Sequence, residues 1–227
     1  MTVTPRTNDL NDNITLVDAE YQRPGLAATY IVREGDAAAI IETGTTHTVP
    51  MILAALEERG LSKEQVRYVI PTHVHLDHAC GAGALIEQCP NAQLVIHPRG
   101  APHMIDPSKL VAGTIAVYGE EKFHALYGDL VPVPEERVIE APDNFEIAMN
   151  HRIFRFLDTP GHAHRVAVSG GQVYVADGPE GLRVKALALA QQAERNPDLV
   201  EKTEAALREA IAAQEDDSIV LYALAQI

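Results

Sequence analysis

Thr72-His73-Val74-His75-Leu76-Asp77-His78 is the stretch that decides the fold, and it stands just after the apolar run Val66–Ile70. That run is short, rich in apolar residues and closed by a proline, so it is predicted to be a buried strand. His73, His75 and Asp77 alternate, and in an extended segment alternate side chains project to the same side. His78 can face a neighbouring position if the chain turns there into a helix beginning near Ala79.

These residue types point to a bound metal. A single histidine is more often a solvated or hydrogen-bonded side chain than a ligand. Three histidines and one aspartate within six residues, directly after a buried strand, favour a metal site instead. Imidazole and carboxylate ligands suit zinc, iron or manganese, and a hydrolytic site keeps one position open for water. The carboxyl end of a strand is also where open α/β sheets bind their ligands.

The composition argues against several kinds of partner. The 227 residues carry a formal net charge of −14, which disfavours nucleic acid and anionic membrane surfaces. No apolar run approaches the roughly 18 residues of a membrane span, and the polar N-terminus lacks the apolar segment of a signal peptide. Cys80 and Cys89 are expected to be reduced, partly buried thiols. We therefore expect a cytoplasmic protein that acts on a small molecule, with homo-oligomerisation left open.

The order of elements predicts a layered α/β protein. In the first half, strands are expected at residues 14–17, 27–33, 37–42, 66–70 and 93–97, with helices at 48–60 and 79–88. Residues 98–134, which include the helix-like run 109–127, form an excursion placed to wall a pocket. A β-rich half follows, with strands at 137–140, 145–148, 152–157, 165–169 and 172–176.

The two ends of the chain are expected to differ from this core. Residues 1–13 are polar and are predicted to be flexible. From residue 181 the pattern changes to two Ala-rich helices, 182–195 and 197–214, and a final strand at 219–224. No repeat and no long linker interrupts the chain, so residues 1–227 are predicted to form one domain.

Four segments together resemble the metallo-β-lactamase superfamily. The stretch 72–78, with the small residues after it, is similar to the family's HxHxDH signature. Ile40-Ile41-Glu42-Thr43-Gly44 resembles the strand end, usually Asp-Thr-Gly, before the first helix. Asp158-Thr159-Pro160-Gly161-His162 resembles the TPGH segment, and Val175-Ala176-Asp177-Gly178 resembles a later strand end, commonly Gly-Asp. The resemblance covers residues 14–178 and implies a four-layer αβ/βα sandwich, in which two packed β-sheets carry helices outside.

The resemblance also implies a set of ligands. His73, His75 and His162 would hold a first metal. Asp77 and His78 would hold a second, and Asp177 would bridge the two. One or two zinc ions are implied, with iron or manganese as alternatives. The family mechanism is attack of a metal-bound hydroxide on an electrophilic carbonyl. Asp77 is assigned the catalytic role of positioning that water and accepting its proton.

Two departures from the family pattern concern the second metal. The family usually takes a late histidine ligand there, whereas no histidine follows His164 in this sequence. We expect a weaker second site, for which His164 is a possible but less favoured substitute. Glu42 stands where aspartate is usual, at a position normally outside the ligand set.

The function expected from these residues is metal-dependent hydrolysis of a small ester, thioester or lactone. An iron enzyme similar to the persulfide dioxygenases of the same fold is the enzymatic alternative. A catalytically weak metal-binding protein is the alternative from another class. Hydrolysis of β-lactams is disfavoured, since those enzymes are mostly exported and no export signal is expected here.

Overall fold

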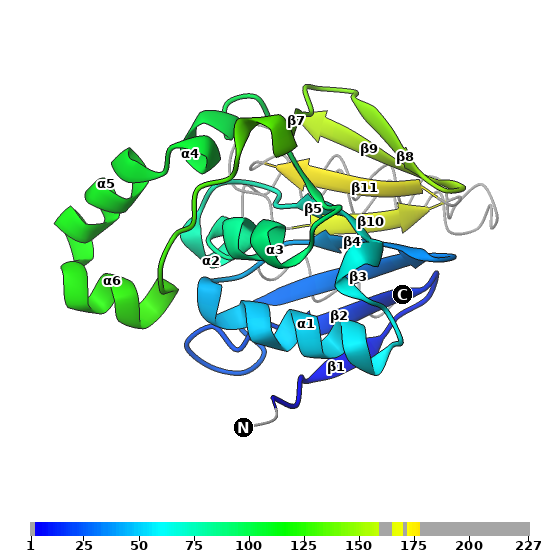
Figure 1. Cartoon of the computed structure of the whole chain (residues 1–227), viewed down its shortest axis with the longest axis horizontal. Helices are drawn as coiled ribbons and strands as arrows, with labels where there is room; N and C mark the ends of the chain where they lie inside the picture. Colours follow the sequence, from blue (N-terminus) through cyan, green and yellow to red (C-terminus); the bar gives the residue numbers. More distant parts are fainter. Residues whose placement is uncertain (1–2, 159–164, 170–171, 178–227) are drawn as a thin grey trace, which may run out of the picture.

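Two β-sheets pack face to face, with helices against the outer side of the larger sheet (Figure 1). The computed structural model of the chain describes residues 3–158, 165–169 and 172–177. The larger sheet has the order β1-β2-β3-β4-β5-β6-β7, and the smaller has the order β10-β11-β9-β8. The strands are β1 (Thr7–Asp9), β2 (Ile14–Asp18), β3 (Ala28–Glu34), β4 (Ala37–Ile41), β5 (Val66–Ile70), β6 (Gln93–Ile96), β7 (Val138–Glu140), β8 (Glu146–Met149), β9 (Arg152–Asp158), β10 (Arg165–Ser169) and β11 (Gln172–Asp177).

Strand β4 lies at the centre of the packing. All five of its residues are buried, because both faces of the larger sheet are covered at this point. Ala38 and Ile40 face the helices, whereas Ala39 and Ile41 face the smaller sheet. From β4 onward the neighbours β5, β6 and β7 run parallel to one another, while β1 to β4 are antiparallel. The parallel half therefore sends several strand ends to one edge.

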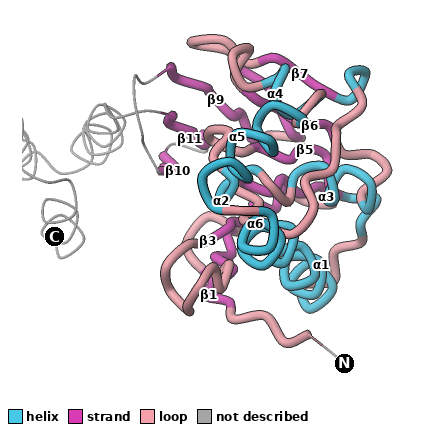
Figure 2. Tube along the Cα trace, turned by 90° about the vertical axis from the view of Figure 1, so that its left-hand side faces the viewer, coloured by secondary structure: helices cyan, strands magenta, loops and turns pink. Residues whose placement is uncertain are grey.

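Helices occur at the expected spans 48–60, 79–88 and 109–127, although the last two spans divide and a helix at 101–105 was not expected. They are α1 (Val49–Glu58), α2 (Leu76–Ala79), α3 (Ala82–Gln88), α4 (Ala101–Ile105), α5 (Ser108–Tyr118) and α6 (Glu120–Tyr127), with short 3-10 helices η1 (Thr46–Thr48), η2 (Lys63–Gln65) and η3 (Glu135–Arg137). The expected helix 109–127 divides at Gly119, whose φ of 82° is outside helical geometry. Figure 2 looks onto the end of the molecule where α2, α5 and α6 lie.

Two expectations fall outside the described residues. The helices expected at 182–195 and 197–214, which would supply the second outer layer, lie there together with the final strand 219–224. The single-domain assignment of residues 1–227 therefore remains a prediction. Within residues 3–158, 165–169 and 172–177, no helix is both long and apolar enough to cross a bilayer.

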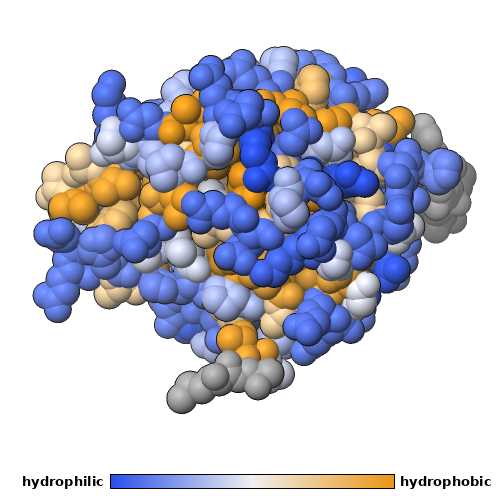
Figure 3. Space-filling view, in the orientation of Figure 1, coloured by the Kyte–Doolittle hydropathy of each residue, from blue (hydrophilic) through white to orange (hydrophobic). Residues whose placement is uncertain are grey.

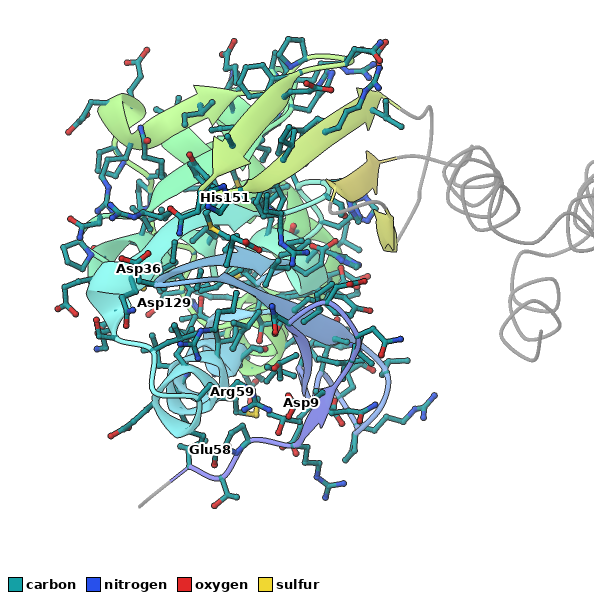
Figure 4. The ribbon with its side chains drawn as sticks, turned by 90° about the vertical axis from the view of Figure 1, so that its right-hand side faces the viewer. Asp9, Asp36, Glu58, Arg59, Asp129 and His151 are labelled. Atoms are coloured by element: carbon teal, nitrogen blue, oxygen red, sulfur yellow. The ribbon has the colours of Figure 1, made fainter. Side chains whose placement is uncertain are left out.

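The segment 1–13, which the sequence predicts to be flexible, contains β1, which pairs with β2. Arg59, just after α1, donates to Asp9 Oδ1 at 2.8 Å and to Thr15 Oγ1 at 2.6 Å. Figure 4 shows Asp9 and Arg59 beside each other at this edge. The Arg59 hydrogen bond lowers the pKa of Asp9 below its usual value. A polar segment can thus be anchored by side chains distant in sequence, which its composition alone does not reveal.

A buried arginine joins the two sheets. Arg152, at the start of β9, places its Nε 3.1 Å from Glu34 Oε2 and donates from Nη2 to the carbonyl of Asp12 at 2.8 Å. The Arg152 side chain is 6% exposed and that of Glu34 is 23% exposed. Removing one partner from such a pair leaves the other without its counter-charge, which is costly in a poorly hydrated position.

We expect Arg152→Ala to lower the free energy of unfolding by about 3 kcal/mol. The control is Arg6→Ala, whose ion pair with Glu20 is largely exposed and should contribute less than about 1 kcal/mol. Urea denaturation followed by circular dichroism measures both. Equal, small losses in the two variants would show that Arg152 does not hold the sheets together.

Candidate metal centre

The site begins where β4 and β5 end. These parallel neighbours pair up to Ile41 and Ile70, and the amide of Glu42 extends the pairing by donating to the carbonyl of Ile70 at 3.0 Å. Glu42 and the segment that begins at Thr72 therefore leave the sheet side by side. This is the same edge at which α2 lies in Figure 1.

The turn after β4 holds the helical turn α2 in place. Both the amide and the hydroxyl of Thr43 donate to the carbonyl of His78, each at 2.8 Å. The amide of Gly81 donates to the carbonyl of Gly44 at 3.1 Å. A Cβ on Gly81 would lie 2.8 Å from the carbonyl oxygen of Thr43, so only glycine fits this close approach. His78 is thus fixed by its backbone as well as by its side chain.

Three histidine rings of the predicted ligand set lie together. The ring centroids of His73 and His75 are 4.7 Å apart, and those of His73 and His78 are 4.4 Å apart. His73 and His78 are buried, whereas His75 is exposed. Three protonated rings this close would repel one another, while neutral rings can share one bound cation. The donor set therefore fits a metal ion.

Asp77 adds a carboxylate to the cluster. Its Oδ2 lies 3.4 Å from Nε2 of His78. Two donors on one tetrahedral ion, each bound at about 2.0–2.1 Å, stand roughly 3.4 Å apart. Asp77 and His78 therefore have the spacing of two ligands of the same metal. Their assignment as ligands remains a prediction.

The electrostatics of the cluster favour a positive charge. Burial alone would raise the pKa of Asp77, but the contact with His78 outweighs it and lowers that pKa to about 2. Burial alone would lower the pKa of His78, but Asp77 and Glu42 raise it to about 10. The carboxylates of Asp77 and Glu42 thus stabilise positive charge at His78. A divalent metal ion bound there would be stabilised by the same two negative charges.

The alternation argument is only partly correct. It holds for His73 and His75, whose rings are adjacent. The helix, however, begins at Leu76 and not near Ala79, because the carbonyl of His75 already accepts from the amides of His78 and Ala79 at 2.9 Å. Asp77 therefore reaches the cluster from a helical turn. The expected helix 79–88 is divided as a result into α2 and α3.

The other predicted ligands are only partly placed. Asp177 is the last residue of β11 and pairs in register with Asp158, the last residue of β9. The arrowheads of both strands point to the end where α2 lies (Figure 1). His162 and His164 lie outside the described residues. Their roles, and the ligand role of the Asp177 side chain, remain predictions.

Sequence reasoning missed the part that Glu42 and Thr72 play. Glu42, His73 and His78 each offer a donor atom, and these atoms lie within 4.8 Å of one another. Glu42 also accepts a hydrogen bond from the hydroxyl of Thr72. An acidic residue that directly ends a wholly apolar strand was the available signal, since a carboxylate is seldom buried there without a partner.

A cavity of about 550 Å³ adjoins the cluster and is bounded by Asp77, His78 and Glu42. Its other described lining residues come from β2, β3 and the loop between them: Leu16, Asp18, Tyr21, Gly25, Leu26, Ala27, Ala28 and Tyr30. Among the described residues, the excursion 98–134 does not line it directly, contrary to expectation. Tyr127 of α6 instead stacks on Tyr21, with ring centroids 6.0 Å apart and hydroxyl oxygens 3.3 Å apart.

The excursion presents an apolar surface of its own. In the space-filling view, apolar side chains gather on the left-hand lobe, over α5 (Figure 3). Helix α5 contains no buried residue, and Val117 is 75% exposed. The excursion contacts the loop 19–27 at a different place, from outside the cavity, through the stacking of Tyr127 on Tyr21.

Comparison with known proteins now identifies the family. The sequence model of the metallo-beta-lactamase superfamily matches residues 23–175. The chain belongs to the metallo-beta-lactamase superfamily. The match contains the stretch 72–78 and extends through His162, so it covers most of the segments whose resemblance was noted in the sequence. No curated protein matches the chain.

Solved structures of the superfamily share the fold at low identity. The FEZ-1 metallo-beta-lactamase from Legionella gormanii is 18% identical, with a TM-score of 0.54, over 72% of this chain and 56% of its own. The subclass B3 enzyme MEM-A1 from a soil metagenome library is 17% identical, with a TM-score of 0.53, over 76% and 61%. SMB-1, bound to 2-mercaptoethanesulfonate, is 15% identical, with a TM-score of 0.55, over 76% and 62%. The chain spans about three fifths of the length of these proteins.

We expect His75→Ala to abolish tight zinc retention. Loss of a direct ligand should weaken binding by more than about 100-fold, since even residues that only orient ligands contribute about 10–100-fold. Metal analysis of the purified variant after dialysis measures this. His103→Ala changes an exposed histidine on α4 and should leave the zinc content unaltered. Parent-like zinc content in His75→Ala would overturn the ligand assignment.

Proposed function

We propose that this member of the superfamily is a zinc-dependent hydrolase of a small, uncharged ester, thioester or lactone. The observation that carries the proposal is the position of the histidine cluster. Asp77 and His78 form one wall of a cavity of about 550 Å³ whose remaining described lining is largely apolar. A metal-binding cluster beside an apolar cavity is the arrangement expected of a small-molecule site.

The chemistry divides between the ion and the side chains. A bound zinc ion polarises a carbonyl group and lowers the pKa of water to roughly 7. His73, His75 and His162 are proposed to hold one ion, and Asp77, His78 and Asp177 a second. The contact with His78 lowers the pKa of Asp77 to about 2, so its carboxylate is ionised at neutral pH. This half-buried carboxylate can orient a water molecule by accepting a hydrogen bond from it, and we propose that it takes the proton of that water during the reaction.

The lining supports an uncharged substrate. Aliphatic side chains and the rings of Tyr21 and Tyr30 offer an apolar surface to an acyl chain. The carboxylates of Asp18, Glu42 and Asp77 lie on the same cavity, and its described lining contains no lysine or arginine. Away from the metal, an anionic group on the substrate would meet these carboxylates and no cationic side chain among the described lining residues.

The loop over the cavity is held by one of these acids. Asp18 accepts from the amide of Glu20 through Oδ1 and from the amide of Gly25 through Oδ2, each at 2.9 Å. The loop that carries Tyr21 and Leu26 is thereby closed on itself. These hydrogen bonds restrict the loop, so Tyr21 and Leu26 can form a fixed apolar side of the cavity.

We expect Asp77→Asn to lower kcat on an activated ester by about 10²–10⁴-fold. The amide keeps the shape of the side chain, so the first metal should be retained. The amide cannot accept the proton, so turnover should fall. Zinc content is measured beside steady-state kinetics. The assignment as a base fails if turnover is unchanged. It also fails if zinc at the site of His73 and His75 is lost in parallel with activity, which would make Asp77 primarily a ligand.

A matched pair of substrates tests the charge preference. We expect kcat/KM for 4-nitrophenyl butyrate to exceed that for mono-4-nitrophenyl succinate roughly tenfold or more, because the terminal carboxylate of the succinate would meet the acidic lining. Removal of zinc with a chelator should abolish both activities. Equal rates would contradict the charge preference alone. Failure of the zinc-loaded protein to hydrolyse either ester would contradict the proposed hydrolase.

A further inference from the structure

Glu42 is a buried carboxylate whose described polar side-chain contacts are with Thr72 and His78. It is 5% exposed. Its Oε1 accepts from the hydroxyl of Thr72, and its Oε2 accepts from the amide of Thr72 at 3.4 Å. The same Oε2 lies 3.3 Å from Nδ1 of His78. One side chain therefore bridges the strand end that leads into the cluster and a histidine of the cluster.

The proton count along this chain fixes the tautomer of two histidines. The hydroxyl of Thr72 donates its single proton to Oε1 of Glu42. The Thr72 oxygen must then accept from Nδ1 of His73, which lies 2.9 Å away. Nδ1 of His78 faces Oε2 of Glu42 at 3.3 Å and is the donor of that contact. With a metal bound, both rings would keep the proton on Nδ1 and present the Nε2 lone pair to the ion.

The backbone at Glu42, which places the carboxylate between Thr72 and His78, is strained. Its φ is 60°, in the left-handed region that glycine and asparagine adopt more easily. Holding another residue there costs on the order of 1–3 kcal/mol. The amide of Glu42 is meanwhile kept on the carbonyl of Ile70. The turn thus directs the carboxylate between Thr72 and His78 and away from the sheet.

We propose that Glu42 is a positioning residue that orients His73 and His78 together, directing Nε2 of each ring to the metal. It acts on His78 directly and on His73 through the hydroxyl of Thr72. Both carboxylate oxygens are directed at these donors, so we assign Glu42 to orienting the ligands and not to binding the ion. Carboxylates that accept from the second nitrogen of a ligating histidine raise metal affinity in this way. The inference rests on the metal site of the proposed function.

The decisive variant is Glu42→Gln, which keeps the size of the side chain but places a donor on one of the two oxygen positions. We expect its zinc affinity, measured by chelator competition, to fall about 10–100-fold. Glu58→Gln changes an exposed glutamate (Figure 4) and should have no effect. In ¹⁵N spectra of the zinc-loaded parent, His73 and His78 should carry slowly exchanging Nδ1 protons, and at least one of these should be lost in Glu42→Gln.

A second variant separates the direct contact of Glu42 with His78 from its contact with His73 through Thr72. It can be measured whether or not Glu42→Gln folds. Thr72→Val removes only the link to His73, so the Nδ1 proton of His73 should exchange rapidly while that of His78 persists. The expected loss of zinc affinity is about tenfold. Thr29→Val is the matched control, because Thr29 is fully buried on β3 and its hydroxyl has no hydrogen-bond partner among the described residues. It should bind zinc as the parent does.

Three results would overturn the inference. The first is a proton on Nε2 of His73 or His78 in the zinc-loaded parent. The second is parent-like zinc affinity in a folded Glu42→Gln, or in Thr72→Val if the first variant does not fold. The third is a carboxylate of Glu42 bound directly to zinc in a crystal structure of the zinc-loaded parent, which would make Glu42 a ligand. All three leave the proposed hydrolase standing, whereas a parent protein that binds no zinc overturns that function as well.

Discussion

The parallel pairing of β4 with β5 is the constraint on which the site depends. Because these strands end at Ile41 and Ile70 in register, the residues that follow each strand meet at one edge. Hydrogen bonds from Thr43 to the carbonyl of His78 then fix the helical turn. The two strands are held by an apolar core on both faces. The polar cluster is thus placed by an apolar core that covers both faces of these strands.

Much of this arrangement could be predicted from the sequence, and the limits have physical reasons. The strand Val66–Ile70 and the histidine stretch were found because a buried strand and a ligand cluster both leave local patterns. The early helix at Leu76 was not, since it depends on the docking of Gly81 against carbonyls of the turn after β4. Strand β1 was missed for a similar reason, because Arg59 anchors it from a distant helix. Contacts between segments far apart in sequence have no local signature.

The candidate site divides along the same line. Its histidines were recognisable from spacing, whereas Glu42 looked like a modest exchange for the family's aspartate. Its importance became visible only from the three donors that converge on its carboxylate. The longer side chain reaches both Thr72 and His78 from a strand end with left-handed backbone geometry. A substitution that seems conservative in a sequence can therefore change which side chains orient a metal site.

The stacked pair Tyr21–Tyr127 has a consequence for how ligand binding can be observed. The chain contains seven tyrosines and no tryptophan, so tyrosine fluorescence is not quenched by energy transfer to an indole ring. Tyr21 lines the cavity and shares its hydroxyl contact with a helix outside it. If a ligand in the cavity displaces the loop, the two rings separate and their fluorescence changes. The stacked pair is then an intrinsic optical reporter beside the candidate site.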